Sequence, residues 1–193
     1  MSITTVTKHR REHTGIEFYF SGAAAETPEH TALREAYLAS GDLVITIALS
    51  EDLLEQTVTT QFASIEILSN YASSMYSAVM RALWLSYNMN GVAYVDYEIS
   101  GLASPFIHKT TYIFPSASDQ VTSILGGLSD NMAGKRTPES LIVTENSLTL
   151  AYKYADSNEY NTYNNQDRLL VNMEQTTAMI SEGVVKTVTY TLV

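Results

Sequence analysis

The chain of 193 residues contains no cysteine. This absence excludes disulfides, thiolate metal sites and a cysteine nucleophile together. Proline and glycine are also scarce, at four and nine residues, while 45% of the residues are hydrophobic, a composition typical of a globular protein. Basic residues number only 11 against 21 acidic ones, and the formal net charge of −10 argues against a broad surface for nucleic acid or anionic membranes.

Long apolar runs are missing as well. The longest stretch almost free of charge, residues 67–95, contains Arg81 and three asparagines, so we do not expect it to span a membrane. The first eight residues lack the charged start and apolar run of a secretory signal. We therefore expect a protein that is made and kept in the cytoplasm, or assembled there into a particle.

The chain is similar to itself at an offset of 92 positions. This offset places Thr57-Val58 on Thr149-Leu150, Phe62-Ala63-Ser64 on Tyr154-Ala155-Asp156, and Gly91-Val92 on Gly183-Val184. Few of these matches are identities, but both copies run through an alternating strand, a small residue, a polar cap, a helical stretch, Gly-Val and another strand. Such a fixed period predicts an internal duplication.

Each half is predicted to fold in the order βαββαβ. Apolar periodicity, Thr27 before Pro28, and the helix-stopping Gly41 set the elements of the first half. Its predicted strands are 16–20, 42–49, 56–62 and 92–99, with helices over 27–40 and 65–89. In the second half the strands are 107–114, 141–143, 148–154 and 184–193, with helices from 118 and from 157 to 181.

This order resembles the ferredoxin-like arrangement, an α+β fold in which two helices cover one face of four antiparallel strands. It predicts ferredoxin-like repeats over 15–101 and 107–193, a linker at 102–106 and an N-terminal arm at 1–14. The arm carries an extra strand, Ile3–Arg11, outside the repeat. An uncovered sheet face needs a partner, so the whole resembles tandem or dimeric α+β-barrel proteins.

No set of residues indicates a reaction. The four histidines, at positions 9, 13, 30 and 108, do not converge by spacing, and no G-x-S-x-G motif marks a nucleophile. Gly134-Lys135-Arg136-Thr137 lacks the upstream glycine spacing of a phosphate loop. We expect no catalytic, cofactor-binding or metal-binding residues, and no enzyme activity.

The helix over residues 65–89 is apolar on all sides, whereas its counterpart over 157–181 keeps a polar stripe. A helix that is apolar all round is buried all round, so this one is predicted to pack against the other domain or another chain. Trp84→Ala should then cost about 3–5 kcal/mol. The predicted interface residues on this helix are Met75, Tyr76, Met80, Leu83, Trp84, Leu85 and Tyr87.

The bases Lys8, Arg10 and Arg11 form a second predicted interface at the end of the N-terminal strand, suited to an acidic neighbour. Because the strand lies outside the predicted repeat, it is free to pair with an edge of another sheet. Deletion of residues 1–11 is accordingly expected to leave a folded protein with weaker association, most of all at low salt.

In its Thr-, Ser-, Asn- and Tyr-rich strands and short capped helices, the sequence resembles virion structural proteins of large tailed bacteriophages. That resemblance implies a multi-copy component of a head, neck or tail, whose partners are its own copies or other virion proteins, with no nucleic acid, membrane or small-molecule substrate. The alternative is a small enzyme resembling the α+β-barrel monooxygenases, or a ligand-binding module, with His108 lining a pocket between helices and sheet.

Overall fold

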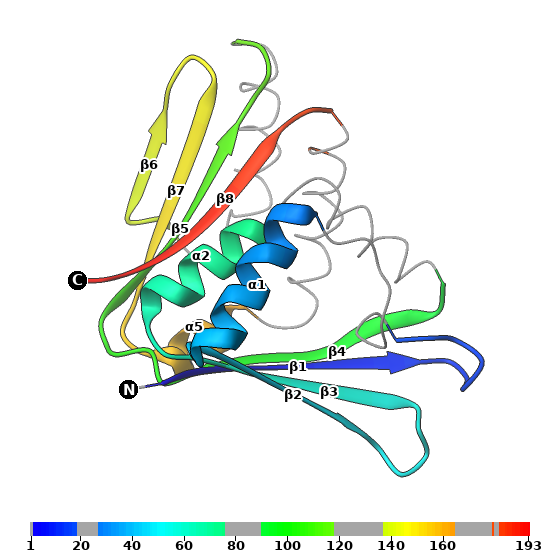
Figure 1. The fold of residues 1–193 in the computed structure, drawn as a ribbon. Coiled ribbons are helices and arrows are strands. Elements are labelled where there is room, and N and C mark those ends of the chain that lie inside the picture. Colours follow the sequence, from blue (N-terminus) through cyan, green and yellow to red (C-terminus); the bar gives the residue numbers. More distant parts are fainter. Residues whose placement is uncertain (1, 19–26, 76–89, 118–136, 165–178, 180–181) are drawn as a thin grey trace.

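The computed structural model describes residues 2–18, 27–75, 90–117, 137–164, 179 and 182–193. These residues form two four-stranded antiparallel sheets and three helices (Figure 1). The expectation of an α+β fold is therefore confirmed. The strands are β1 (Ile3–Arg11), β2 (Leu43–Leu49), β3 (Glu55–Phe62), β4 (Val92–Ser100), β5 (Phe106–Ile113), β6 (Ser140–Val143), β7 (Ser147–Tyr154) and β8 (Val185–Leu192). The helices are α1 (Pro28–Ser40), α2 (Ile65–Met75) and α5 (Ser157–Tyr163).

The two sheets have the same strand order. The first runs β2-β3-β1-β4 and the second β6-β7-β5-β8. In Figure 1 the sheets meet near the two termini and diverge like the arms of a V, with α1 and α2 in the angle between them. The strands β3 and β7 lie 92 positions apart at both of their ends, as the sequence offset predicts.

The strand Ile3–Arg11 is not an extra element outside the first sheet, and this expectation was wrong. It lies inside the sheet, pairing with β3 from Ile3 opposite Phe62 onward and with β4 on its other side. The first strand predicted at residues 16–20 is absent over residues 16–18, which follow a turn at residues 14–15. An offset without a gap cannot detect the long connection between β1 and α1, so it matched the wrong segment.

Local signals place the helix ends where the sequence predicts them. The Thr27 hydroxyl accepts from the backbone N–H of His30 at 3.1 Å, Pro28 opens α1, and Gly41 ends it at φ 78°. Ser64 accepts from the amide of Ile67 at 3.3 Å at the start of α2. Asp156 caps α5 in the same way, accepting from the amide of Glu159.

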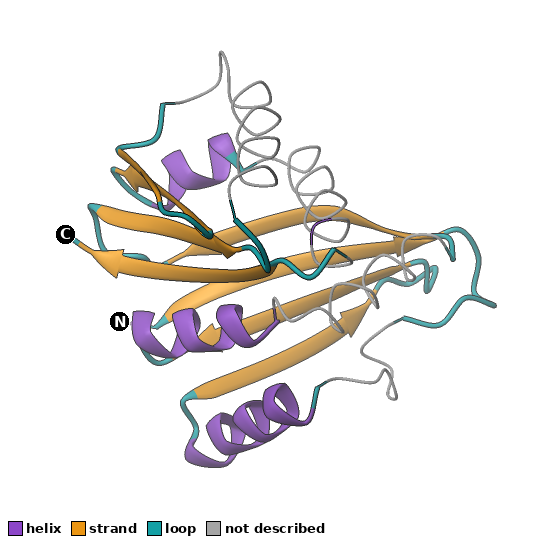
Figure 2. Ribbon diagram, turned by 90° about the horizontal axis from the view of Figure 1, so that it is seen from above, coloured by secondary structure: helices purple, strands orange, loops and turns teal. Residues whose placement is uncertain are grey.

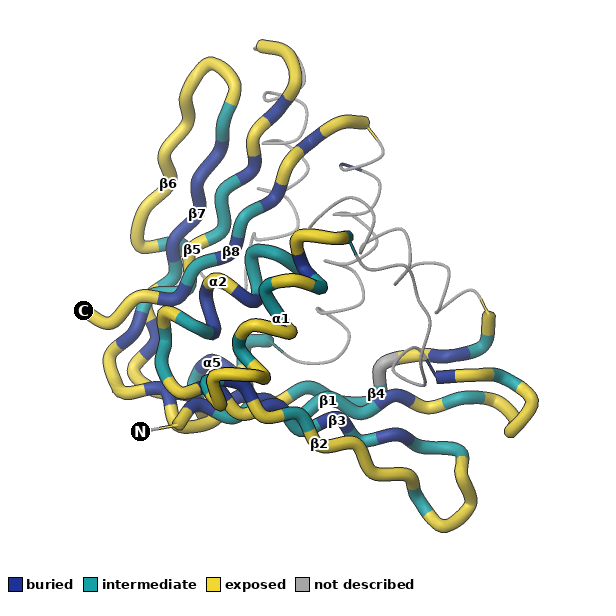
Figure 3. The backbone as a smooth tube through the Cα atoms, in the orientation of Figure 1, coloured by how far each residue is buried: buried dark blue, intermediate teal, exposed yellow. Residues whose placement is uncertain are grey.

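One apolar core joins the two halves. Ile3, Phe62 and Leu68 from the first half pack in the same cluster as Phe106 and Val188 from the second. In Figure 3 buried residues lie where the sheets meet and also along both sheets, while the connecting turns at the far ends are exposed. A second cluster, which includes Phe114 and Leu148, lies within the second half. Part of the apolar surface of the chain is therefore buried between its halves, as two domains of this size often require.

The turn into the linker depends on Gly101. This residue has φ 79°, and a Cβ built on it would lie 2.4 Å from the backbone oxygen of Ser2. Any side chain here would meet backbone, which cannot move aside. The close approach ties the start of β1 to the segment that leads into the second half.

Candidate functional site

Helix α2 of the first half covers the edge of the second sheet. The Ser69 hydroxyl accepts from the backbone N–H of Tyr190 at 2.8 Å and donates to its carbonyl oxygen at 3.0 Å. One turn further, the Ser73 hydroxyl donates to the carbonyl of Val188 at 2.6 Å. These bonds satisfy backbone groups that the edge strand β8 would otherwise offer to another strand.

Helix α5 does the same for the first sheet. The Asn161 carboxamide accepts from the amide of Ile99 in β4 at 3.0 Å and donates to its carbonyl at 2.8 Å. Asn161 stands 92 positions after Ser69, so the same helix position serves in both halves. A helix therefore occupies part of the β8 edge and part of the β4 edge, at the residues that bond to Ser69, Ser73 and Asn161.

At the opposite edge of the first sheet, no further strand among the described residues pairs with the sheet. Strand β2 ends the sheet on that side, and its seven residues include no charge and no proline. Val44, Ile47 and Leu49 are 47%, 44% and 52% exposed. Native proteins usually protect a free edge with lysine, proline or a bulge. We call the outer edge of residues 43–49 the β2 edge, and it is the candidate functional surface.

The backbone groups that β2 offers to solvent follow from its pairing with β3. Ser50 donates to the carbonyl of Glu55 at 2.9 Å, and Ala63 donates to the carbonyl of Asp42 at 2.9 Å. Because antiparallel pairs alternate between bonded and non-bonded, the even-numbered residues of β2 bond to β3. The N–H and C=O groups of Leu43, Ile45, Ile47 and Leu49 consequently point outward from the sheet.

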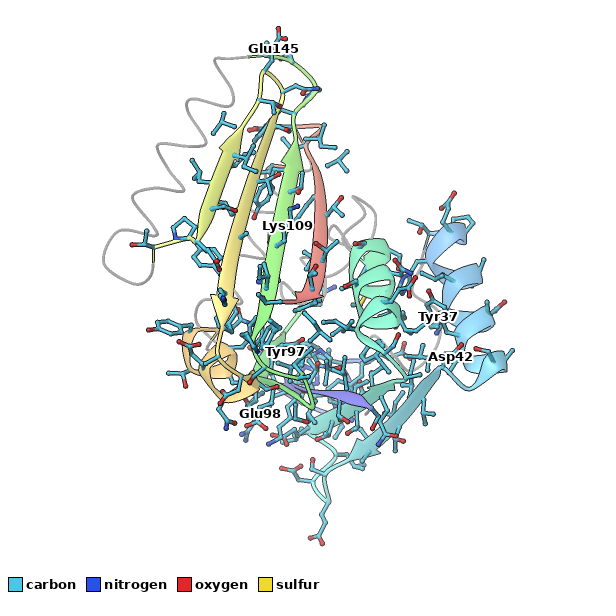
Figure 4. The ribbon with its side chains drawn as sticks, turned by 90° about the vertical axis from the view of Figure 1, so that its left-hand side faces the viewer. Tyr37, Asp42, Tyr97, Glu98, Lys109 and Glu145 are labelled. Carbon is cyan, nitrogen blue, oxygen red and sulfur yellow. The ribbon has the colours of Figure 1, made fainter. Side chains whose placement is uncertain are left out.

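The second sheet ends in a shorter open edge at β6. Leu141, Ile142 and Val143 are between 44% and 54% exposed. Figure 4 shows this sheet with Lys109 in its middle and Glu145 at the tip of the β6–β7 hairpin. Four residues give this edge about half the hydrogen-bonding length of the β2 edge.

Sequence reasoning did not identify the β2 edge as an interface. The run LVITIAL predicts a strand, and its lack of any charge or proline is the one sequence signal that could have indicated an interface. Strand order, which places this run at an edge, depends on pairing between distant segments. No local pattern carries that information.

Of the predicted interface residues on the helix, only Met75 lies within the described residues. It ends α2 and is partly buried against the core that joins the two halves. The described part of this helix contacts the second sheet through Ser69 and Ser73. The other predicted positions lie outside the described residues, so their role stays a prediction: Tyr76, Met80, Leu83, Trp84, Leu85 and Tyr87.

The structure separates the three predicted basic residues. Lys8 forms an ion pair with Asp96 at 3.9 Å, and Arg10 is exposed on the same face of β1. Arg11 points to the other face, where its guanidinium donates to the carbonyls of Leu53 and Ile16 and lies over a phenylalanine ring. Arg11 therefore holds the turn after β1, while Lys8 and Arg10 remain near solvent.

His108 lies in a group of aromatic rings on the helix-facing side of the second sheet. Its ring stacks on Tyr190, with centroids 5.0 Å apart, and meets Tyr160 edge-on at 5.6 Å. Burial, and to a smaller extent the positive charge of Lys186, lowers the pKa of His108 to about 3. The imidazole is therefore neutral at physiological pH.

The remaining histidines lie apart from one another. His9 is fully buried in β1, and this burial lowers its pKa to about 4. The Nδ1 atom of His30 lies 2.7 Å from the hydroxyl of Ser74, which itself donates to the carbonyl of Tyr71. His13 accepts from a backbone amide in the exposed turn after β1.

Two further kinds of site are absent from the part of the chain that the structure describes. No three His, Asp or Glu side chains among them are grouped so as to hold a metal ion. None of the described helices has the length and apolar character needed to cross a membrane.

Comparison with known proteins gives little likeness. No family model matches the chain, and no curated protein matches it. Among solved structures, it is similar to a putative monooxygenase from Lactobacillus acidophilus, with 12% identity, a TM-score of 0.30, and coverage of 99% of this chain and 93% of that one. It is also similar to a chain in the crystal structure of A. aeolicus tRNASec in complex with M. kandleri SerRS, with 10% identity, a TM-score of 0.23, and coverage of 94% of this chain and 32% of that one.

Proposed function

We propose that this chain is a non-enzymatic structural protein that works by assembling with its own copies or with other proteins. The observation that carries the proposal is the β2 edge, a seven-residue apolar strand edge with no protecting charge or proline. Left open, such an edge promotes uncontrolled aggregation. A protein built to assemble covers it in its working state.

The specific form that the sequence resemblance implies is a multi-copy component of a tailed-phage virion. Many identical contacts are needed in such particles, and a strand edge supplies one through backbone hydrogen bonds. The helix contacts at β4 and β8 support the proposal in a second way. They occupy part of both inner edges, so β2 and β6, at the far ends of the two described sheets, are the edges better suited to ordered contacts.

We further propose that the two halves descend from one duplicated ferredoxin-like unit. The shared strand order supports this, as do the equivalent edge contacts of Ser69 and Asn161. Gly91 and Gly183 also stand 92 positions apart, and both have positive φ, at 84° and 87°. A shared strand order together with two unrelated features that recur at one offset is difficult to explain by convergence.

The assembly role is tested by measuring mass in solution. Sedimentation velocity of the purified chain, over a wide concentration range and with proteins encoded beside it, should reveal a species heavier than the 21.3 kDa monomer. A chain that stays monomeric alone and with every one of those neighbours would refute the role.

A ligand-binding or enzymatic role is the second candidate, and the surroundings of His108 are the observation that favours it. A neutral imidazole beside Tyr160 and Tyr190 provides a hydrogen-bonding atom among flat apolar surfaces, which suits an aromatic ligand. A thermal-shift screen with small aromatic compounds tests this. A compound that raises the melting temperature of the native chain but not of His108→Ala would favour this candidate over the structural role.

A further inference from the structure

We propose that two copies of this chain pair through their β2 edges about a two-fold axis at Thr46. The pairing would join the first sheets of both copies into one continuous antiparallel sheet of eight strands. It rests on the proposed assembly role and names its partner, a second copy of the chain. A closed two-fold contact of this kind is the commonest form of oligomer.

The backbone of the edge is self-complementary in this register. Antiparallel pairing about Thr46 places Ile45 opposite Ile47 of the partner subunit and Leu43 opposite Leu49 of the partner subunit. All four residues direct their N–H and C=O groups outward, so each opposed pair can exchange two hydrogen bonds. Thr46 then faces its own copy at a non-bonded position, where side chains lie closest.

Side-chain exposure along the strand is complementary in the same register. On the helix-facing side, Leu43 is 1% exposed, Ile45 is intermediate, and Ile47 and Leu49 are 44% and 52% exposed. A two-fold pairing therefore sets the uncovered half of each strand beside the covered half of its partner. A partner strand whose side chains were equally exposed along its length would complement this rise in exposure from Leu43 to Leu49 less well.

In the proposed pair, helix α1 of one copy covers the exposed side chains on β2 of the other. Figure 1 shows it above the first sheet, and in Figure 2 it lies beyond the outer edge of β2. Near the end of this helix Leu38 is 42% exposed, three residues before the turn that leads into β2. In the proposed pair, α1 of one copy overhangs the strand of the other, above the exposed Ile47 and Leu49.

Charge decides how the pairing responds to salt. The strand is flanked by Asp42, labelled in Figure 4, and by Glu51 and Asp52 in the β2–β3 turn. Hydrogen bonds from the Ser50 hydroxyl and the Leu54 amide lower the pKa of Asp52, which keeps it ionised. Arg10 also acts on Asp52 through its positive charge. Each end of the pair still brings together Asp42 of one copy with Glu51 and Asp52 of the other, three acids against one base, so added salt should strengthen this association by screening their repulsion. Docking through Lys8 and Arg10 onto an acidic surface would weaken with salt instead.

The register is tested by disulfide cross-linking. Because the chain has no native cysteine, a disulfide can form only between introduced cysteines. Opposed residues at non-bonded positions have Cα atoms about 4.5 Å apart, within disulfide range. Thr46→Cys should therefore give a covalent dimer on mild oxidation. Ala48→Cys, equally exposed on the same face, is the matched control and should give at least tenfold less, because two copies of residue 48 lie about 13 Å apart along the strands. Equal yields from both variants would overturn the two-fold register.

Substitution of a lysine into each of the edge strands β2 and β6 tests which strand edge forms the dimer interface. Ile47→Lys on β2 and Val143→Lys on β6 change side chains that are both 44% exposed, so neither should unfold the monomer. We expect Ile47→Lys to raise the dimer dissociation constant at least tenfold and Val143→Lys to change it less than twofold. Association that survives Ile47→Lys, or is lost in both variants, would overturn this interface and leave the assembly role standing. A wild-type chain that never associates with anything would overturn the assembly role itself.

Discussion

Replacing Asn161 with alanine should destabilise the protein because this one side chain satisfies both backbone groups of Ile99. The residue Ile99 is 1% exposed, and its N–H and C=O bond to the carboxamide at 3.0 and 2.8 Å. Leaving a buried donor or acceptor without a partner costs about 1–3 kcal/mol each, so for the two groups we expect a total loss of about 2–6 kcal/mol.

The assay is thermal and urea unfolding followed by circular dichroism. For a chain of this length a loss of 1 kcal/mol lowers the melting temperature by about 2–4 °C, so the expected shift is about 4–24 °C. Asn158→Ala is the matched control, since Asn158 is an exposed asparagine on the same helix. Its effect should stay within about 0.5 kcal/mol.

The comparison between the two variants decides whether α5 holds the edge of β4. A loss of stability in Asn161→Ala no larger than that in Asn158→Ala would refute the reasoning. It would mean that water or a neighbouring group satisfies β4 as well as the carboxamide does, and that α5 does not hold this edge.

Three further predictions follow from the fold. Deleting residues 1–11 should abolish the folded state, because β1 lies between two strands that both lose their partner, and circular dichroism of the truncated chain would show it. Gly41→Ala should cost about 1–2 kcal/mol for its positive φ alone, and Gly101→Ala more, because its Cβ also meets backbone; urea unfolding compares them. Since His9 has a lowered pKa in the folded state, the unfolded state binds more protons between pH 6.5 and 4, and stability should fall by about 3 kcal/mol as pH drops through that range. The His9→Gln variant should lose this part of the pH dependence in urea titrations, whereas His13→Gln should keep it.

Features governed by neighbouring residues could be predicted from the sequence. Thr27 followed by Pro28, Asp156 before its helix, and the alternation in β3 and β7 each depend on contacts within a few residues. The offset of 92 positions also located matching strands in the two halves. Such local chemistry is nearly independent of the rest of the fold.

Features governed by distant pairing could not be predicted. Two alternating segments, at 3–11 and 16–20, competed for the first strand, and periodicity alone does not say which one a sheet accepts. For the same reason the roles of Ser69 and Asn161 could not be predicted. In a sequence, a polar helix residue that faces water cannot be distinguished from one that bonds to a strand edge. It also hid the exposure of β2, which its apolar sequence would place in a core.

The contact between α5 and β4 also means that the first sheet is completed only late in the synthesis of the chain. Asn161 follows Ile99 by 62 residues, so β4 leaves the ribosome well before the helix that completes its hydrogen bonding. At about 5–20 residues per second, the interval is roughly 3–12 s. For that time the nascent chain carries two open strand edges on its first sheet instead of one. Nascent chains crowded on one message are therefore at greater risk of cross-pairing than finished molecules, and slower translation over residues 100–161 would lengthen that risk.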